Sequence, residues 1–113
     1  MEIRISQLDN ETCVVEVHEG DAGPIVDYLN VQQNGYAIFG EDIELPIAVV
    51  DGRNLQRHDW FTKDHLIAIE AHELGHIRMQ SSLEEVAELE GIRLLENLGY
   101  EKAANLLIER GVV

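Results

Sequence analysis

Apolar residues follow two different periods along this chain, and the change of period divides it into two halves. In the first half, partial alternation at residues 3–5 and 13–17 predicts a β-hairpin. Further apolar runs at 36–39 and 43–50 predict two more strands. Pro46 cannot donate to a strand ladder, so part of the last run is expected at a sheet edge or a bulge. The first half should therefore form a small sheet.

A short helix is predicted between the hairpin and the third strand. Asp21 can cap it, Pro24 suits its first turn, and the apolar residues that follow give it one buried side. Asn34-Gly35 then turns the chain, because both residue types tolerate turn conformations.

The second half of the chain follows a helical period. Thr62 or Asp59 can cap a helix that runs to about Met79, and its apolar residues cover more than half of its circumference. Such a helix is largely buried. Gly75 costs about 1 kcal/mol relative to alanine inside a helix, so its presence predicts that another backbone packs closely at this point.

Two shorter helices are predicted to follow. Ser82-Leu83-Glu84-Glu85 has the sequence of a capping box, which would start a helix that Gly99 ends. A last helix over 100–110 is stopped by Gly111. The predicted fold class is therefore α+β, with a small sheet followed by a long helix and two C-terminal helices, in a single domain spanning 1–113.

Composition and charge limit the partners that this chain can have. A hydrophobic content of 45% with few aromatic residues predicts a folded core built from aliphatic side chains. Eight Lys and Arg stand against 22 Asp and Glu, and the net charge of −14 argues against nucleic acid and against anionic membranes as partners. No apolar run approaches the length of about 18 residues that spans a bilayer, and Cys13 is the one cysteine. We therefore expect a cytoplasmic protein.

One motif in the long helix carries recognisable chemistry. Ala71-His72-Glu73-Leu74-Gly75-His76 is a complete HExxH pattern. His72 and His76 lie one helical turn apart on one face, so their imidazoles can share one tetrahedral Zn²⁺. Two histidines and Glu73 in so apolar a helix would carry a desolvation cost that a divalent cation offsets. The motif therefore predicts a zinc site.

A third protein ligand has to come from outside the motif, and three acidic residues follow it closely. If the chain reverses after the long helix, Glu84 lies opposite His76 and Glu88 lies opposite His72. Glu85 is the residue that the capping box would occupy. Spacing alone therefore leaves Glu84 or Glu88 as the third ligand.

The HExxH pattern followed by Glu84-x-x-Ala87-Glu88 resembles the paired motifs of gluzincin-type zinc metallopeptidases. The chain looks like a very small gluzincin, similar in motif to thermolysin-like, M48-like and phage and bacterial ImmA/IrrE-like enzymes. The resemblance covers about residues 66–95. It implies that Glu84 is the third zinc ligand and that Glu88 hydrogen-bonds to His72 and orients it. Glu88 is one methylene longer than the Asp or Asn of the family pattern, so the two roles could be exchanged.

The same resemblance implies zinc-dependent hydrolysis of peptide bonds. Water bound to zinc would attack the peptide carbonyl, and Glu73 would act as its general base. The substrate would be a peptide or a protein, and the strand over 43–50 is the candidate to border the cleft. Arg57 and His58 are candidates to stabilise the oxyanion, as are Tyr36 and Tyr100.

The short chain leaves an alternative function open, because it has little room for the second lobe of larger peptidases. It could be a non-catalytic zinc-binding module, which would need the histidines but not Glu73. It could also be a peptidase domain whose cleft is completed by a second copy, as a homo-oligomer, or by a partner protein.

Overall fold

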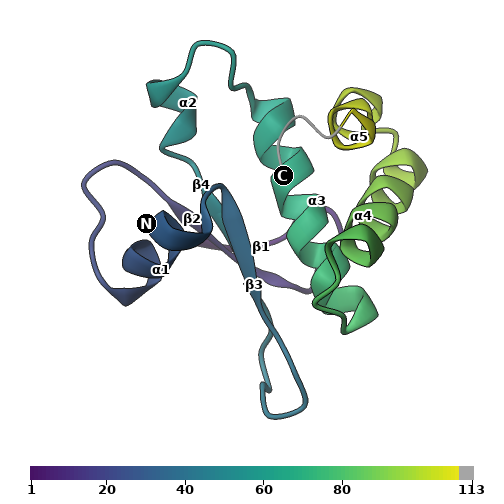
Figure 1. Ribbon diagram of the computed structural model, residues 1–113, viewed down its shortest axis with the longest axis horizontal. Helices are drawn as coiled ribbons and strands as arrows, with labels where there is room; N and C mark the ends of the chain where they lie inside the picture. The colour runs from purple at the N-terminus through teal and green to yellow at the C-terminus, as the bar shows by residue number, and fades with distance from the viewer. Residues whose placement is uncertain (110–113) are drawn as a thin grey trace.

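The computed structural model describes residues 1–109, and its centre is a four-stranded mixed sheet. In the order β1-β2-β4-β3, the strands are β1 (Glu2–Ile5), β2 (Cys13–Val17), β4 (Ile47–Asp51) and β3 (Gly35–Ile38) (Figure 1). β1 and β2 pair antiparallel, β2 and β4 parallel, and β4 and β3 antiparallel. The predicted hairpin and the α+β class are confirmed.

β4 differs from the prediction in both its extent and its position. The strand begins at Ile47, directly after Pro46, so the proline needs no place in the ladder. β4 is a central strand, because it pairs with β2 on one side and with β3 on the other. The segment 43–50 was therefore the wrong candidate for the strand bordering a cleft, since β3 occupies that edge of the sheet.

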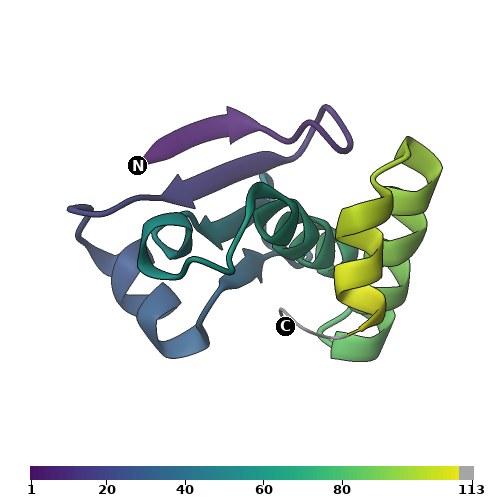
Figure 2. The ribbon, with the colours of Figure 1, turned by 90° about the horizontal axis from the view of Figure 1, so that it is seen from above.

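The helices form layers on both faces of the sheet. They are α1 (Pro24–Gln32), α2 (Asn54–Arg57), α3 (Lys63–Met79), α4 (Glu84–Leu98) and α5 (Glu101–Ile108). α1 packs on one face and α3 on the other, each over its own cluster of buried aliphatic side chains. α4 and α5 lie side by side against α3, on the side away from the sheet (Figure 2). Across residues 1–109, no helix has the length and apolar character needed to cross a membrane.

The start of α3 is fixed by a capping box. The Thr62 side chain accepts from the backbone at the third helical position, where His65 stands. In return, the Thr62 backbone N–H donates to Nδ1 of His65 over 3.1 Å. This confirms Thr62 rather than Asp59 as the cap, and it turns the His65 ring to the end of the helix.

Three other predicted helix ends had different outcomes. The capping box over 82–85 is wrong, because Leu83 is the N-cap of α4 and makes no side-chain cap hydrogen bond. Gly23, not Asp21, precedes α1, where Pro24 supplies the first turn as predicted. The predicted stop of the last helix at Gly111 lies outside the described residues.

α3 and α4 are antiparallel and approach each other closely at two glycines. A Cβ atom on Gly75 would lie only 2.1 Å from the carbonyl oxygen of Ala87. A Cβ atom on Gly91 would lie 3.0 Å from the carbonyl oxygen of Ala71. The close backbone contact predicted from Gly75 is confirmed, and it carries the first turn of α4 to the histidine face of α3.

Candidate metal centre

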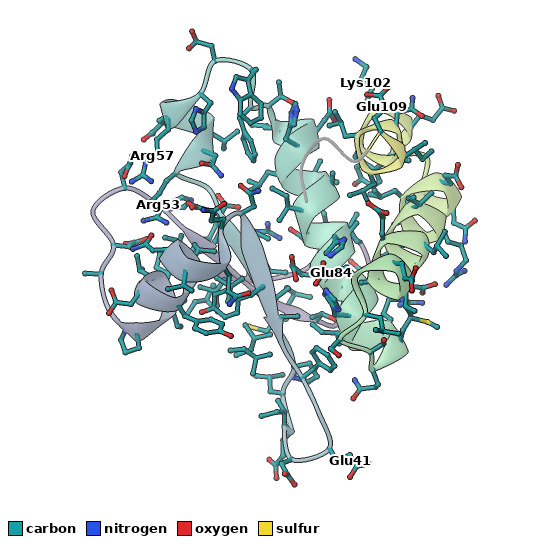
Figure 3. The ribbon with its side chains drawn as sticks, in the orientation of Figure 1. Glu41, Arg53, Arg57, Glu84, Lys102 and Glu109 are labelled. Carbon is teal, nitrogen blue, oxygen red and sulfur yellow. The ribbon has the colours of Figure 1, made fainter. Side chains whose placement is uncertain are left out.

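Two histidines of α3 and the first residue of α4 meet at one point. Nε2 of His72 lies 2.7 Å from Oε2 of Glu84, and Nε2 of His76 lies 3.3 Å from Oε1 of the same carboxylate. One ligand atom from each of the three residues falls within 4.8 Å of the others. Figure 3 shows Glu84 over α3, between β3 and α4. Of the three acidic candidates, Glu84 is the one that contacts both histidines.

The three residues differ sharply in their burial. His72 is 2% exposed and His76 is 6% exposed, because both lie on the side of α3 that other elements cover. The Glu84 side chain is 72% exposed. Two nitrogens therefore reach the site from the protein interior and one carboxylate reaches it from the solvent side, which leaves the site accessible to water and to a ligand.

The hydrogen bonds of the histidines prepare them to bind a cation. Nδ1–H of His76 donates to the Ser81 carbonyl over 2.7 Å, which turns Nε2 toward Glu84. Burial lowers the pKa of His72, although the negative charges of Glu84 and Glu88 oppose this shift. A neutral imidazole is the form that binds metal.

The chemistry of this donor set fits a divalent metal ion. Two imidazole nitrogens and one carboxylate are a common protein ligand set for catalytic zinc, with one coordination position left open. Within residues 1–109, Nδ1 of His72 is the one buried side-chain polar atom that lacks a hydrogen-bond partner. With a metal held at Nε2, the ring proton would lie on Nδ1, and a nearby acid could accept a hydrogen bond from this Nδ1–H.

Glu88 and Glu85 stand at the margin of the site. Glu88 lies on α4, partly buried, and its charge opposes the lowering of the His72 pKa by burial. Its predicted hydrogen bond to His72 and the exchange of roles with Glu84 stay predictions. Glu85 is exposed and does not belong to the cluster of potential metal ligands.

Glu73 lies beside this cluster in a buried position. Burial raises the pKa of its carboxyl to about 8, and the nearby charge of Glu84 adds to the effect. Its Oε2 lies under the start of β3, where a Cβ atom on Gly35 would be 3.2 Å away. The same Cβ would be 2.8 Å from Ile69 and 2.9 Å from the Val49 carbonyl, so glycine is needed for this close approach of strand and helix.

The cluster opens into a cavity of about 450 Å³. α3 forms its floor, β3 and the end of α1 form one wall, and the first turn of α4 forms the other. Phe39, which follows β3, stacks on the ring of His76 with a centroid separation of 6.1 Å. The cavity therefore brings parts of both halves of the chain to the same site.

A turn at the mouth of the cavity has unusual backbone geometry. Gln33 and Asn34 both have positive φ, 64° and 63°, and the Gly35 N–H donates to the Gln33 carbonyl over 2.7 Å. The Asp51 N–H donates to the Asn34 carbonyl, and the Asn54 amide donates to the Asn34 side chain. These bonds hold a turn that few residues adopt unaided. The sequence signalled only a turn at Asn34-Gly35.

The residues considered for oxyanion stabilisation lie elsewhere or are engaged. Arg57 and His58 line a different hollow, and Arg57 donates twice to Glu19 over 2.8 and 2.7 Å. Figure 3 shows Arg57 on the α2 side of the molecule, away from Glu84. Tyr36 reaches the cavity, but its hydroxyl donates to the Ile25 carbonyl.

Two further tyrosines differ from what the sequence indicated about the cavity. Tyr100 packs against the core cluster under α3 and does not line the cavity. Tyr28 of α1 lines the cavity, and the sequence analysis missed it because nothing in its spacing distinguished it from the other apolar residues of α1.

A second group of potential metal ligands lies on the hairpin. Glu2, Glu16 and His18 each place one ligand atom within 4.8 Å of the others. Arg4 contacts both acids, at 3.6 and 3.2 Å, and His18 lies 2.6 Å from Glu16. Arg4 therefore already supplies both acids of this group with a positively charged partner.

Comparison with known proteins adds no family assignment. A scan against protein-family models and searches of curated proteins and of solved structures gave no match. The likeness to gluzincin-type peptidases therefore rests on the motifs at 72–76 and 84–88 alone.

Proposed function

We propose that this chain is a zinc-dependent metallopeptidase of gluzincin-like type. His72, His76 and Glu84 would hold one Zn²⁺, and Glu73 would be the general base. The observation that carries the proposal is the convergence of two buried imidazole nitrogens and one solvent-side carboxylate beside a second, buried acid, Glu73. This combination has the ligand count of a catalytic zinc site rather than of a closed structural one.

In the proposed hydrolysis, the zinc ion and the side chains of the protein have different roles. A zinc ion at this position supplies a Lewis acid, which polarises a carbonyl group and makes water more acidic. Glu73 would be ionised for this role by the positive charge of the bound ion, which opposes the burial that raises its pKa to about 8. It would take a proton from the attacking water and deliver it to the leaving nitrogen of the peptide. Its burial under Gly35 holds the carboxylate in one orientation, and the His76–Ser81 hydrogen bond holds one ligand ring.

The surroundings of the site favour an extended peptide as the substrate. β3 lines the cavity, and in the described part of the chain it pairs with β4 alone. An edge strand offers unpaired backbone groups to which an extended peptide can hydrogen-bond. Ala37 and Phe39 would lie on the cavity side of such a pair.

The proposal is tested by the variant Glu73→Gln. Glutamine keeps the size of the side chain but cannot act as the base, so hydrolysis of an unstructured polypeptide should fall by roughly two or more orders of magnitude. Zinc content, measured by elemental analysis, should stay near that of the wild type, whereas His72→Ala as the control should lose the metal. Equal and measurable hydrolysis by the wild type and by Glu73→Gln would refute the peptidase mechanism.

The exposure of the Glu84 side chain, at 72%, favours a second candidate function. The site is open to solvent on the Glu84 side. The domain could therefore bind zinc without catalysis, or it could need a partner or a second copy to complete the cleft. A binding module would retain zinc and show no hydrolysis in either the wild type or Glu73→Gln. A partner-dependent enzyme would gain Glu73-dependent hydrolysis when the partner is added.

A further inference from the structure

A second hollow adjoins the metal cavity across the edge strand β3. This hollow, which we call the α1 groove, has a volume of about 480 Å³ and lies between β3 and the first turns of α1. It shares Tyr28, Tyr36, Ala37 and Phe39 with the metal cavity. The two hollows therefore adjoin each other at the free edge of the strand.

The α1 groove carries no charge on a strongly charged protein. Charged residues make up 27% of the chain, and the net charge is −14. Within the described residues, every side chain that lines the groove is uncharged: Pro24, Ile25, Tyr28, Tyr36, Ala37, Ile38 and Phe39. Such a surface favours an uncharged, apolar group, and the net negative charge of the protein disfavours an anionic one.

The aromatic wall of the groove is held in place before any ligand arrives. The Tyr36 hydroxyl donates to the Ile25 carbonyl over 3.0 Å, which fixes this ring between β3 and α1. The Tyr28 ring packs edge-on against it, with centroids 4.8 Å apart and planes at 83°. Tyr28 is still 53% exposed, so it keeps a large free surface for contact.

Strand geometry relates the groove to the metal site. Along β3, Tyr36 and Ile38 belong to the core cluster on the α1 face, whereas Ala37 belongs to the cluster on the α3 face. A peptide strand paired with β3 would alternate its side chains in the same way. One side chain would face the histidines, and its neighbours would face the α1 groove.

We propose, as an extension of the peptidase function, that the substrate is an extended polypeptide segment with a large uncharged side chain, aromatic or aliphatic, in the α1 groove. Tyr28 is the specificity-determining residue. The selected side chain lies within one or two positions of the bond that is cleaved, because the groove and the metal cavity meet at β3.

The test measures peptide binding in the absence of cleavage, because the Glu73→Gln protein lacks the proposed general base. The binding probe is a set of fluorescent peptides in which Phe, Leu, Asp or Lys is placed at each position in turn, added to the zinc-loaded Glu73→Gln protein. The variants Tyr28→Ala and Tyr28→Phe are compared in that background. Val31→Ala is the matched control, because Val31 is on the same helix and 73% exposed but does not line the groove.

The best Phe or Leu peptide should bind about tenfold more tightly than its Asp counterpart, and Tyr28→Ala should remove most of that difference, since an aromatic contact surface is lost. Tyr28→Phe and Val31→Ala should keep it. Equal binding of the Phe and Asp peptides, or an unchanged preference in folded Tyr28→Ala, would overturn the inference. Failure of the proposed peptidase function would show in a different experiment, the hydrolysis assay, as equal activity of the wild type and Glu73→Gln.

Discussion

The contact between Gly75 and Ala87 should control both the stability of the protein and its affinity for zinc. Gly75 lies between the two histidines of α3, and its backbone touches the first turns of α4. The substitution Gly75→Ala adds one methyl group at this contact. Because Glu84 is less than one turn from Ala87, any shift of α4 moves the third ligand away from the histidines.

The size of the effect follows from the distances. The added Cβ atom would meet the Ala87 carbonyl oxygen at 2.1 Å, and real Cβ contacts essentially never fall below 3.0 Å, so one helix must move by about 0.9 Å. The overlapping atoms belong to the backbone, so no side-chain rotation relieves them. We expect an overpacking cost of about 3 kcal/mol, offset by about 1 kcal/mol from the better helix propensity of alanine.

The expected net loss of about 2 kcal/mol corresponds to a fall in melting temperature of roughly 8 °C for a domain of this size. A displacement of about 0.9 Å also exceeds the tolerance of a zinc–ligand distance, which is about 0.2 Å, so zinc affinity should fall by roughly one to two orders of magnitude. Thermal unfolding monitored by circular dichroism, with and without zinc, and competition with a zinc-binding dye measure the two effects.

Gly91→Ala is the matched control for the same helix pair. Its Cβ atom would meet the Ala71 carbonyl oxygen at 3.0 Å, so shifts of a few tenths of an ångström suffice. It also lies two turns away from Glu84, and its further contact, with the His72 backbone nitrogen at 3.2 Å, is relieved by the same small shift. It should therefore change stability by less than about 1 kcal/mol and leave zinc affinity close to that of the wild type. If Gly75→Ala matched the wild type in both measurements, the close crossing would not be what positions Glu84.

Two further predictions concern acidic residues of α4. Glu84→Ala should weaken zinc binding much more than Glu85→Ala, because only the first carboxylate contacts both histidines; equal losses in a zinc titration would contradict this ligand assignment. Hydrogen bonds from Arg93 and Arg78 lower the pKa of Glu90 from 4.5 to about 2, so its contribution to stability is present above about pH 4.5 and is lost as the pH falls toward 2. Glu90→Gln should therefore flatten the acid dependence of urea unfolding between about pH 7 and about pH 3, and a slope equal to that of the wild type would count against the ion pairs.

Several features of this protein follow from its sequence because local geometry determines them. A helix of 3.6 residues per turn places His72 and His76 on one face whatever the rest of the chain does. The end of α4 at the left-handed residue Gly99, with φ 85°, also depends only on its immediate neighbours, whereas the sequence left the cap of α3 open between Thr62 and Asp59. Gly75 signalled a close helix contact, because its cost inside a helix needs a compensating reason.

The sequence alone could not select the third ligand or the walls of the cavity. Glu84 was chosen over Glu88 only through a family pattern, since the direction of α4 depends on the turn after α3 and on the close contacts at Gly75 and Gly91. Neither helix specifies that contact by itself.

The buried Glu70 illustrates the same limit. It is 1% exposed and accepts hydrogen bonds at 2.6 Å from Arg4 and from Ser6, which are more than sixty residues earlier in the chain. Contacts between distant segments also produce three other features: the strand order β1-β2-β4-β3, the approach of Gly35 to Glu73 and the α1 groove. Each depends on pairing between segments that are distant in the sequence, and apolar periodicity specifies which face of an element is buried but not which element covers it.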